Sequence, residues 1–172
     1  MNSMTLDRER LVTETNHIVT SCLDRKASMQ ALADLLRNRG NYRWVGLYEV
    51  ALATAMVNNI VWSGPAAPEY PDFPLSKGLT GSAIANRRTV NVGDVASDPR
   101  YLTAFGSTRS EIIVPIFDGA RESVVGTIDV ESEEPHFFSA EVQHVLEACA
   151  AAASPLWKSL PLPPDTKSPG VY

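Results

Sequence analysis

Residues 111–117, EIIVPIF, and residues 123–132, SVVGTIDVES, decide the fold class of this chain. Both runs are rich in β-branched and other apolar residues, which favour strands. The five residues between them, DGARE, include a glycine and form a connection short enough for a hairpin. Because a hairpin joins antiparallel neighbours, we predict an antiparallel sheet.

Further strands are predicted upstream of that hairpin. Residues 42–50, YRWVGLYEV, and residues 54–64, TAMVNNIVWSG, are rich in aromatic and β-branched side chains. A shorter strand is predicted at residues 89–95. The loop at residues 64–74 holds four prolines, so we expect an irregular connection there. Residues 96–110 are expected to form a loop with about one helical turn.

Helical periodicity lies near both ends of the chain. Apolar residues follow one helical face in residues 5–24, 28–39 and 139–157. Gly40 is the predicted stop of the second helix, and Ser139 is the predicted N-cap of the last. Long terminal helices around a hairpin-based sheet predict an α+β class, with these helices together on one face.

The length bounds the number of domains. A chain of 172 residues is long enough for one compact domain and too short for two ordinary ones. We expect this domain at residues 1–157, with the N-terminal helices in 5–39, the sheet and pocket in 42–132, and the last helix in 139–157. Residues 158–172 hold four prolines and are expected to form an extended or disordered tail.

Composition excludes several function classes. Hydrophobic residues at 44% and charged residues at 20% are globular values. A net charge of -5 argues against nucleic acid as the main partner, because such binding needs a dense basic face. The N-terminus lacks a signal-peptide layout, and no apolar run approaches the roughly 18 residues of a spanning helix. We therefore expect a cytoplasmic protein with no membrane partner.

Metal-binding residues are sparse. The two cysteines, Cys22 and Cys149, both lie in segments predicted as helices, outside any Cys-x-x-Cys pair. His17, His136 and His144 are dispersed, without the close spacing of metal ligands. We predict no metal site and no cofactor, and we expect the cysteines to act as small buried hydrophobic residues.

A glycine bend precedes the middle of the chain. Residues 76–84, SKGLTGSAI, place two glycines around Leu79 and Thr80 at the point where a loop becomes a helix. The local role favoured for Thr80 is that of a helix N-cap. Such a bend also directs backbone N–H groups outward, which suits an anionic or carboxylate group.

Strand alternation groups the candidate functional side chains. Because residues two apart share one face of a strand, Asp129 and Glu131 lie on the same face. Trp44, Gly46 and Tyr48 likewise share a face of their own strand.

The same residues have ordinary structural alternatives, which remain open at this point. Trp44 and Tyr48 are compatible with core aromatics. The two strand acids are compatible with exposed carboxylates of a half-solvated strand. Glu111, two residues after Arg109, is compatible with a local surface ion pair.

Taken together, four blocks of the sequence resemble the GAF domain family. Within that family they are most similar to the branch that contains the free methionine-(R)-sulfoxide reductases. The resemblance covers roughly residues 10–157. The blocks are NYRWVGLYEV (41–50), LSKGLTGSAIANRRTVNVGDVASDPRY (75–101), TRSEIIVPI (108–116), and VVGTIDVES (124–132) followed by FFSAEVQHVLEACA (137–150).

This resemblance implies a fold that agrees with the pattern above. It implies a central antiparallel sheet of about six strands. The N- and C-terminal helices pack on one face, and a ligand pocket lies on the other. Loops around residues 64–80 and 96–110 are expected to form the roof of that pocket.

At the two positions where the reductases of this branch have redox cysteines, this sequence has other residue types. Where the reductases have Gly-Val-Cys-Gly or Gly-Ile-Cys-Gly, residues 78–81 read Gly-Leu-Thr-Gly, so Thr80 occupies one cysteine position. The other position, seven residues before Glu111, falls on Ala104. Thiol-based sulfoxide reduction needs an attacking thiolate and a second thiol. We therefore predict that this chain lacks the reductase activity.

The ligand-binding residues of the family are implied by the same blocks. The acids that hold the amino group of the sulfoxide match Glu111, Asp129 and Glu131, the last being one methylene longer than the family's aspartate. Acids on the concave side of a sheet suit an ammonium group, and aromatic walls add about 0.5–2 kcal/mol through cation–π contact. The candidate site is therefore Trp44, Tyr48, Thr80, Ala104, Glu111, Asp129 and Glu131.

Functional hypotheses of two classes follow. We favour a stand-alone, small-molecule-binding GAF module, sensory or regulatory, that recognises an amino-acid derivative and acts through a signalling partner or as a homodimer. The alternative is a non-redox enzyme that uses a pocket carboxylate as general base. Residual sulfoxide reduction would require Cys22 or Cys149 to reach the pocket.

Overall fold

The computed structural model describes residues 7–21, 24–103 and 105–157. At its centre is a six-stranded sheet in which every neighbouring pair is antiparallel. The strands, in spatial order, are β3 (Asp72–Pro74), β2 (Met56–Ser63), β1 (Trp44–Ala51), β6 (Val124–Ser132), β5 (Ser110–Phe117) and β4 (Val90–Val92).

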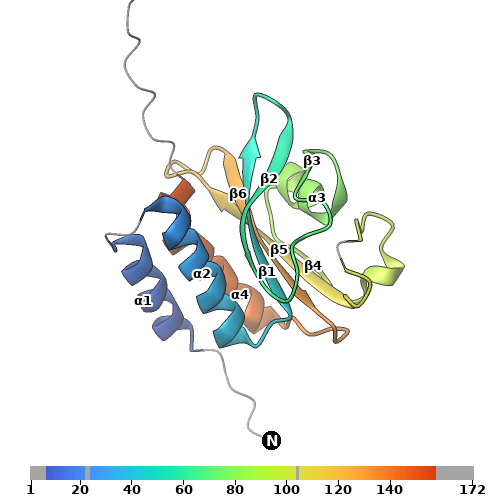
Figure 1. Ribbon diagram of the computed structural model, residues 1–172, viewed down its shortest axis with the longest axis horizontal. Coiled ribbons are helices and arrows are strands. Elements are labelled where there is room, and N and C mark those ends of the chain that lie inside the picture. The colour runs from blue at the N-terminus through green and yellow to red at the C-terminus, as the bar shows by residue number, and fades with distance from the viewer. Residues whose placement is uncertain (1–6, 22–23, 104, 158–172) are drawn as a thin grey trace, which may run out of the picture.

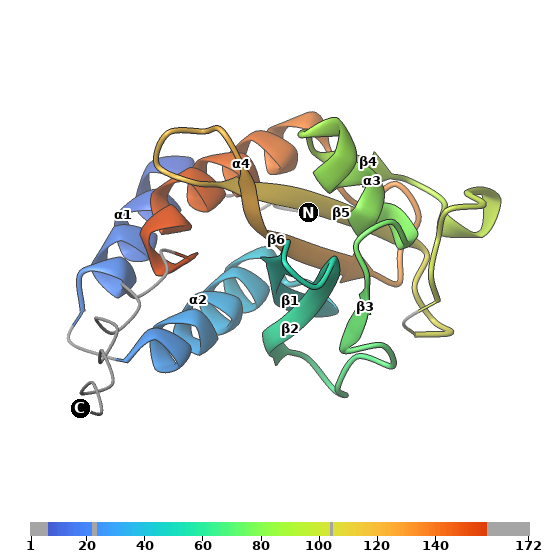
Figure 2. The ribbon, with the colours of Figure 1, turned by 90° about the horizontal axis from the view of Figure 1, so that it is seen from above.

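Helices cover the two faces of this sheet unequally. Three long helices, α1, α2 and α4, lie on one face, and the short α3 lies on the other (Figure 1 and Figure 2). The predicted fold class, an antiparallel six-stranded α+β sheet with the terminal helices on one face, is confirmed. The helices are α1 (Arg8–Val19), α2 (Arg25–Gly40), α3 (Gly78–Asn86) and α4 (Ala140–Ala153).

Side-chain caps set where the helices begin. The Asp24 carboxylate accepts a hydrogen bond from the N–H of Ala27, so α2 begins at Arg25 rather than at residue 28 as predicted. Ser139 caps α4 as predicted, its hydroxyl accepting from the N–H of Val142.

The ends of two helices differ from the prediction. Gly40 is still helical, and Asn41 forms the C-cap in the left-handed conformation with φ 51°. The last helix ends at Ala153 and continues as a 3-10 helix over Ser154–Trp157.

One strand was missed in the proline-rich loop. Strand β3 occupies Asp72–Pro74 and pairs with the start of β2, with Phe73 opposite Val57. It is an edge strand, where a proline is tolerated because the outer backbone groups need no partner strand. The helical turn expected in residues 96–110 is a 3-10 helix that starts one residue earlier, at Val95–Ser97.

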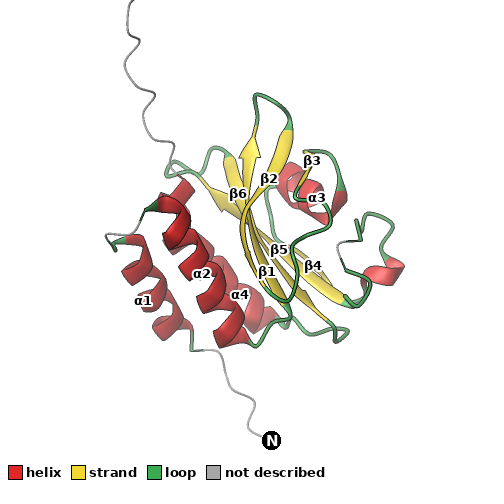
Figure 3. Cartoon of the chain, viewed as in Figure 1, coloured by secondary structure: helices red, strands yellow, loops and turns green. Residues whose placement is uncertain are grey.

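The main hydrophobic core lies between the sheet and the three long helices (Figure 3). Alternate residues of the central strands point into it and are fully or almost fully buried. Within the described residues, none of the helices has the length and apolar character needed to cross a membrane. The strand residues of this core are Val45, Leu47, Val61, Ile112, Val114, Ile116, Ile128 and Val130.

Candidate ligand pocket

The strand residues on the opposite face form rows across the sheet. Glu131 on β6 lies directly between Trp44 on β1 and Glu111 on β5 in the strand register. In the next row Asp129 lies between Gly46 and Ile113. Directly opposed residues of antiparallel strands point to the same face. The register therefore brings together acids and aromatic residues that are far apart in the sequence.

These rows form the floor of a small cavity, here called the carboxylate pocket. Its volume is about 30 Å³. Six of the seven predicted site residues line it, and Ala104 lies outside the described residues. The lining residues are Trp44, Tyr48, Pro68, Tyr70, Phe73, Gly78, Leu79, Thr80, Leu102, Glu111, Asp129 and Glu131.

Aromatic side chains form one wall of the pocket. The Trp44 ring lies 6.5 Å from that of Tyr48 and 5.5 Å from that of Phe105, measured between centroids. Gly46 makes this convergence possible, because a Cβ there would lie 2.2 Å from the Trp44 ring and 2.9 Å from the Tyr48 ring. The indole N–H of Trp44 donates to the carbonyl of Ala66 and thereby ties the roof loop to β1.

The two glycines of the SKGLTGSAI stretch have separate structural reasons. Gly78 opens α3 with φ +71°, a conformation that residues with a Cβ rarely adopt. At Gly81 a Cβ would lie 2.7 Å from the carbonyl oxygen of Leu75, so only glycine lets the helix approach the preceding loop. Both glycines therefore place the first turn of α3 at the pocket.

Thr80 does not cap this helix, and that prediction was wrong. The N-cap is Lys77, which makes no side-chain capping bond, and Thr80 lies inside the first turn. Its hydroxyl instead donates to Oδ2 of Asp129, with 2.7 Å between the oxygens. The residue at the tip of the bend thus connects α3 to the acid on β6.

The three acids are buried, which rules out the exposed-carboxylate alternative. The exposed fractions are 8% for Glu111, 3% for Asp129 and 1% for Glu131. Among the ion pairs of the described residues, none joins Glu111 to Arg109. The guanidinium of Arg43 lowers the pKa of Glu131, but it forms its ion pair with the exposed Glu133.

Burial raises the pKa of Asp129 to about 7. The hydroxyls of Thr127 and Thr80 oppose this shift, although Thr127 lies outside hydrogen-bond geometry. The second oxygen of Asp129, Oδ1, is buried with no hydrogen-bond partner among the described residues. Sequence reasoning did not identify Thr127, but it shares the alternation of Asp129 and Glu131 and was detectable on that ground.

The two glutamates are perturbed in the same direction. Burial raises the pKa of Glu131 to about 7, and the hydroxyl of Thr108, which donates to Glu131, opposes this rise. Burial together with the neighbouring Glu131 and Asp129 raises the pKa of Glu111 well above its usual value. A site where three carboxylates share one dry region strongly favours their neutral forms unless a cation enters.

The pocket is narrow in this structure. A volume of about 30 Å³ accommodates one or two water molecules, whereas sites for small molecules typically measure about 300–1,000 Å³. Pro68 and Tyr70 line it from the loop between β2 and β3, and Leu102 lines it from the loop before β5. These two segments are the ones expected to form the roof.

Cys149 lies on the other side of the sheet. It is fully buried among the residues of the helical core, and burial raises the pKa of its thiol to about 11. Cys22 is outside the described residues. Among the described residues, no group of three or more His, Cys, Asp and Glu side chains is arranged to hold a metal ion.

Comparison with known proteins assigns the family. The chain is 25% identical over 130 residues to GAF domain-containing protein A of Dictyostelium discoideum, covering 76% of this chain and 79% of that protein. It is 30% identical over 111 residues to the free methionine-R-sulfoxide reductase of Saccharomyces cerevisiae, covering 62% and 58% of the two chains.

A solved structure gives the same result for the fold. The free methionine-R-sulfoxide reductase of Neisseria meningitidis, in complex with its substrate, superimposes with a TM-score of 0.82 at 25% identity, covering 91% of this chain and 92% of that one. The family model described as "GAF domain" matches residues 24–155, which include all the strands and most of the helical core. The chain therefore belongs to the GAF domain family.

Proposed function

We propose that the carboxylate pocket binds a small molecule with an ammonium group, an amino acid or a close derivative, without thiol redox chemistry. GAF domains bind small molecules and are often sensory. The observation that carries the proposal is Oδ1 of Asp129, a buried carboxylate oxygen with no hydrogen-bond partner among the described residues. It lies in a cavity that two further buried acids line.

A cluster of buried acids without a positive partner destabilises the fold unless a ligand compensates its charge. A buried polar group without a partner costs about 1–3 kcal/mol, and a buried charge costs more. The Thr80 and Thr108 hydroxyls each satisfy one oxygen of an acid, but they bring no positive charge. An ammonium group supplies both the missing donor and the missing charge, so the cluster is better explained by a cationic ligand than by the needs of the fold.

The first turn of α3 suits the other end of an amino acid. Because Lys77 provides no side-chain cap, the N–H groups at the start of α3 are not satisfied by capping. Gly78, Leu79 and Thr80 of this turn line the pocket. Unsatisfied N–H groups and the helix dipole favour a carboxylate. The aromatic wall of Trp44 and Tyr48 is then left for the side chain of the ligand.

We infer the absence of sulfoxide reduction from Thr80, the residue at the tip of the bend. The Thr80 hydroxyl is held by Asp129, and a hydroxyl does not form the disulfide that a thiol reaction cycle requires. Cys149 is buried behind the sheet with a raised thiol pKa, which disfavours the reactive thiolate.

A non-redox enzyme is the second candidate, and one observation favours it. The pKa values of Asp129 and Glu131, each about 7, are those expected of a general base that works near neutral pH. The first candidate differs from this enzyme because its ligand is released chemically unchanged. It would act as a sensor, through a partner protein or through a homodimer.

The small volume of the pocket sets a condition on binding. A ligand of amino-acid size exceeds the cavity, so the segments that carry Tyr70 and Leu102 must move outward before it enters. Phe105 packs on Trp44 and moves with the second segment.

Thermal unfolding of the full chain tests the proposal. We would measure it at pH 8 with the two sulfoxide epimers of L-methionine, L-methionine and glycine. A ligand at a hundredfold excess over its Kd stabilises by about 2.7 kcal/mol, which raises the Tm by roughly 5–10 °C for a domain of this size. We expect such a shift with at least one α-amino acid. Chromatography of the ligand after incubation with a dithiol distinguishes binding from turnover.

Matched variants identify the site. Asp129→Asn and Glu131→Gln keep the shape of the side chains and remove the charge, and each should abolish the shift. Glu122→Gln, an exposed acid of the turn between β5 and β6, should leave it intact. A shift that survives in Asp129→Asn, or no shift with any amino acid, would overturn the proposal. Conversion to a product other than methionine would support the non-redox enzyme instead, and reduction of the sulfoxide to methionine would overturn the inference that thiol redox chemistry is absent.

A further inference from the structure

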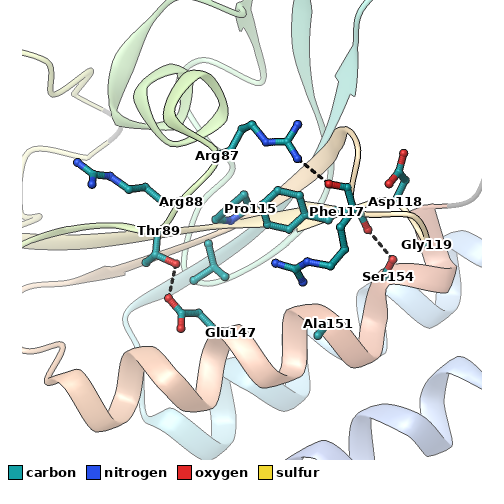
Figure 4. Close-up of a pocket in the computed structure, with 12 residues that line it drawn as sticks. Arg87, Arg88, Thr89, Pro115, Phe117, Asp118, Gly119, Glu147, Ala151 and Ser154 are labelled. Atoms are coloured by element: carbon teal, nitrogen blue, oxygen red, sulfur yellow. Dashed lines mark hydrogen bonds between the residues drawn. The ribbon is translucent and has the colours of Figure 1, made fainter.

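A second and larger cavity, here called the arginine cavity, lies at the β5 side of the sheet. Its volume is about 480 Å³, within the range of about 300–1,000 Å³ typical of small-molecule sites. The end of α3, the outer half of β5 with its hairpin turn, and α4 form its walls (Figure 4). It shares no lining residue with the carboxylate pocket.

The cavity exists because β4 is too short to cover β5. Strand β4 pairs only with Glu111, Ile112 and Ile113, so β5 has no strand neighbour on this side beyond them. Pro115 has no N–H, and the carbonyl of Phe117 already accepts from the Ser154 hydroxyl at 2.6 Å. The exposed edge is therefore poorly suited to pairing with another strand, and side chains must provide any binding.

Arg87 is oriented towards the cavity by the backbone. It forms the C-cap of α3 with φ 54°, in the left-handed region that usually takes glycine or asparagine. Its guanidinium donates to the carbonyls of Arg121, at 2.6 Å, and Glu122. A guanidinium has five N–H donors, so three remain available. Because the group is already fixed, a ligand would cost it little further entropy.

Arg121 approaches the same aromatic ring. It also has a positive φ, 57°, and its guanidinium carbon lies 4.6 Å from the centroid of the Phe117 ring. The guanidinium carbon of Arg87 lies 5.5 Å from that centroid. No ion pair of the described residues engages either side chain. Two positive charges thus share one ring without a carboxylate partner, in a protein with a net charge of -5.

The acids that line the cavity are bonded elsewhere. Asp118 accepts from the backbone N–H of Glu122 within the hairpin turn. Glu147 on α4 accepts from the Thr89 hydroxyl at 2.6 Å (Figure 4). It also accepts from the Gln143 amide at 2.9 Å. Neither acid forms an ion pair with Arg87 or Arg121, and the apolar residues Val114 and Ala151 also line the cavity.

We propose that the arginine cavity binds a small molecule whose phosphate or carboxylate group contacts Arg87 and Arg121. Guanidinium groups recognise both kinds of oxyanion through paired N–H donors. Val114 and Ala151 would contact the remainder of the ligand. This site is independent of the carboxylate pocket and of the function proposed for it.

Titration of the full ¹⁵N-labelled chain at low, constant ionic strength tests the inference. The probes are pyrophosphate, citrate, and a hexaglutamate peptide. We expect saturable amide shifts confined to residues 87–89 and 117–121 with pyrophosphate or citrate, and the stronger of the two distinguishes phosphate from carboxylate. Loss of a charged hydrogen bond in Arg87→Ala or Arg121→Ala should weaken binding about tenfold.

Control variants distinguish binding at a specific site from nonspecific attraction between opposite charges. Arg8→Ala removes the same charge from the first turn of α1 and should leave the Kd unchanged. The side chain of Arg121 makes no hydrogen bond with the described residues, so Arg121→Ala should unfold at the wild-type temperature even if Arg87→Ala does not. Absence of saturation at millimolar probe, equal weakening by Arg8→Ala, or binding of hexaglutamate alone would each overturn the proposal.

Discussion

Along β6 the two faces of the sheet are both buried, but the side chains that point to them differ in chemistry. Along β6, Ile128 and Val130 point into the helical core and are completely buried. Between and beside them, Asp129 and Glu131 point into the carboxylate pocket and are 3% and 1% exposed. A single strand therefore alternates between residues that stabilise the fold by leaving water and residues that lose their hydration without forming an ion pair among the described residues.

The helical face therefore provides stability, and the pocket face provides the candidate ligand site. The helical face gains free energy from apolar burial, whereas the pocket face gives up part of that gain to keep three acids dry. Such a distribution is typical of sites held ready for a ligand, since binding then releases the stored cost. Variants on the two faces should accordingly have opposite effects on stability and on binding.

The largest effect is expected on the helical face. Ile128→Ala leaves a cavity in the core and should lower the free energy of unfolding by about 2–5 kcal/mol. Urea unfolding measures it. At a temperature where the variant is folded, its ligand-induced Tm shift should match that of the wild type. Loss of ligand response without loss of stability would contradict the division between the faces.

Much of this division was predictable from the sequence, because it follows from strand alternation. The hairpin of β5 and β6 fixed both the antiparallel class and the shared face of Asp129 and Glu131. The acid–aromatic set was then assigned through the family resemblance, and its residues do converge on one cavity.

The features of the fold and site that were not predicted depend on contacts between residues far apart in the sequence, which no local pattern encodes. Strand β3 was missed because its proline is acceptable only at an edge, and the edge is defined by the order of all six strands. Thr80 was assigned a cap from its position after a glycine, but its partner is 49 residues away. The arginine cavity draws on three separate segments, so its residues had no common sequence signal.

The second prediction concerns pH. Burial raises the pKa of Asp129 and of Glu131 to about 7 in the folded chain, above the usual values near 4 of the unfolded chain. The folded state then binds more protons than the unfolded state between these values, so stability falls as the pH rises from about 4 to 8. We expect a loss of about 2–3 kcal/mol for each of the two acids between pH 5 and pH 8, measured by urea unfolding.

Variants of each face sharpen that prediction. Asp129→Asn should flatten the pH dependence and be the more stable protein at pH 8. Ile128→Ala should be less stable throughout with the slope of the wild type. An unchanged slope in both Asp129→Asn and Glu131→Gln would show that these acids are not the groups that titrate.

The third prediction concerns a variant that narrows the carboxylate pocket and leaves its charges unchanged. In Gly46→Ala the new methyl group would overlap the Trp44 and Tyr48 rings, which are themselves buried. We expect a loss of about 1–3 kcal/mol from overpacking and a weaker ligand response. Gly119→Ala, where a Cβ meets nothing within 4 Å, is the matched control. A normal response in Gly46→Ala would place the ligand away from the aromatic wall.

The smallest effect is expected at Thr80, and it depends on pH. Thr80→Val keeps the shape of the side chain and removes the hydroxyl that donates to Oδ2 of Asp129. That hydrogen bond favours the ionised acid, so its loss should raise the pKa of Asp129 further. The cost should be about 1–2 kcal/mol at pH 8, where the acid is charged, and smaller at pH 6, where it is mostly protonated.

The conservative variant separates the hydroxyl from the packing of the threonine. Thr80→Ser retains the donor and should show little of this pH-dependent cost, although it removes the methyl group from a buried site. If Thr80→Val costs the same at both pH values, the hydroxyl does not act through the charge of Asp129. In that case the bend of the SKGLTGSAI stretch would stabilise only the packing of α3, and the acid on β6 would need another source of stabilisation.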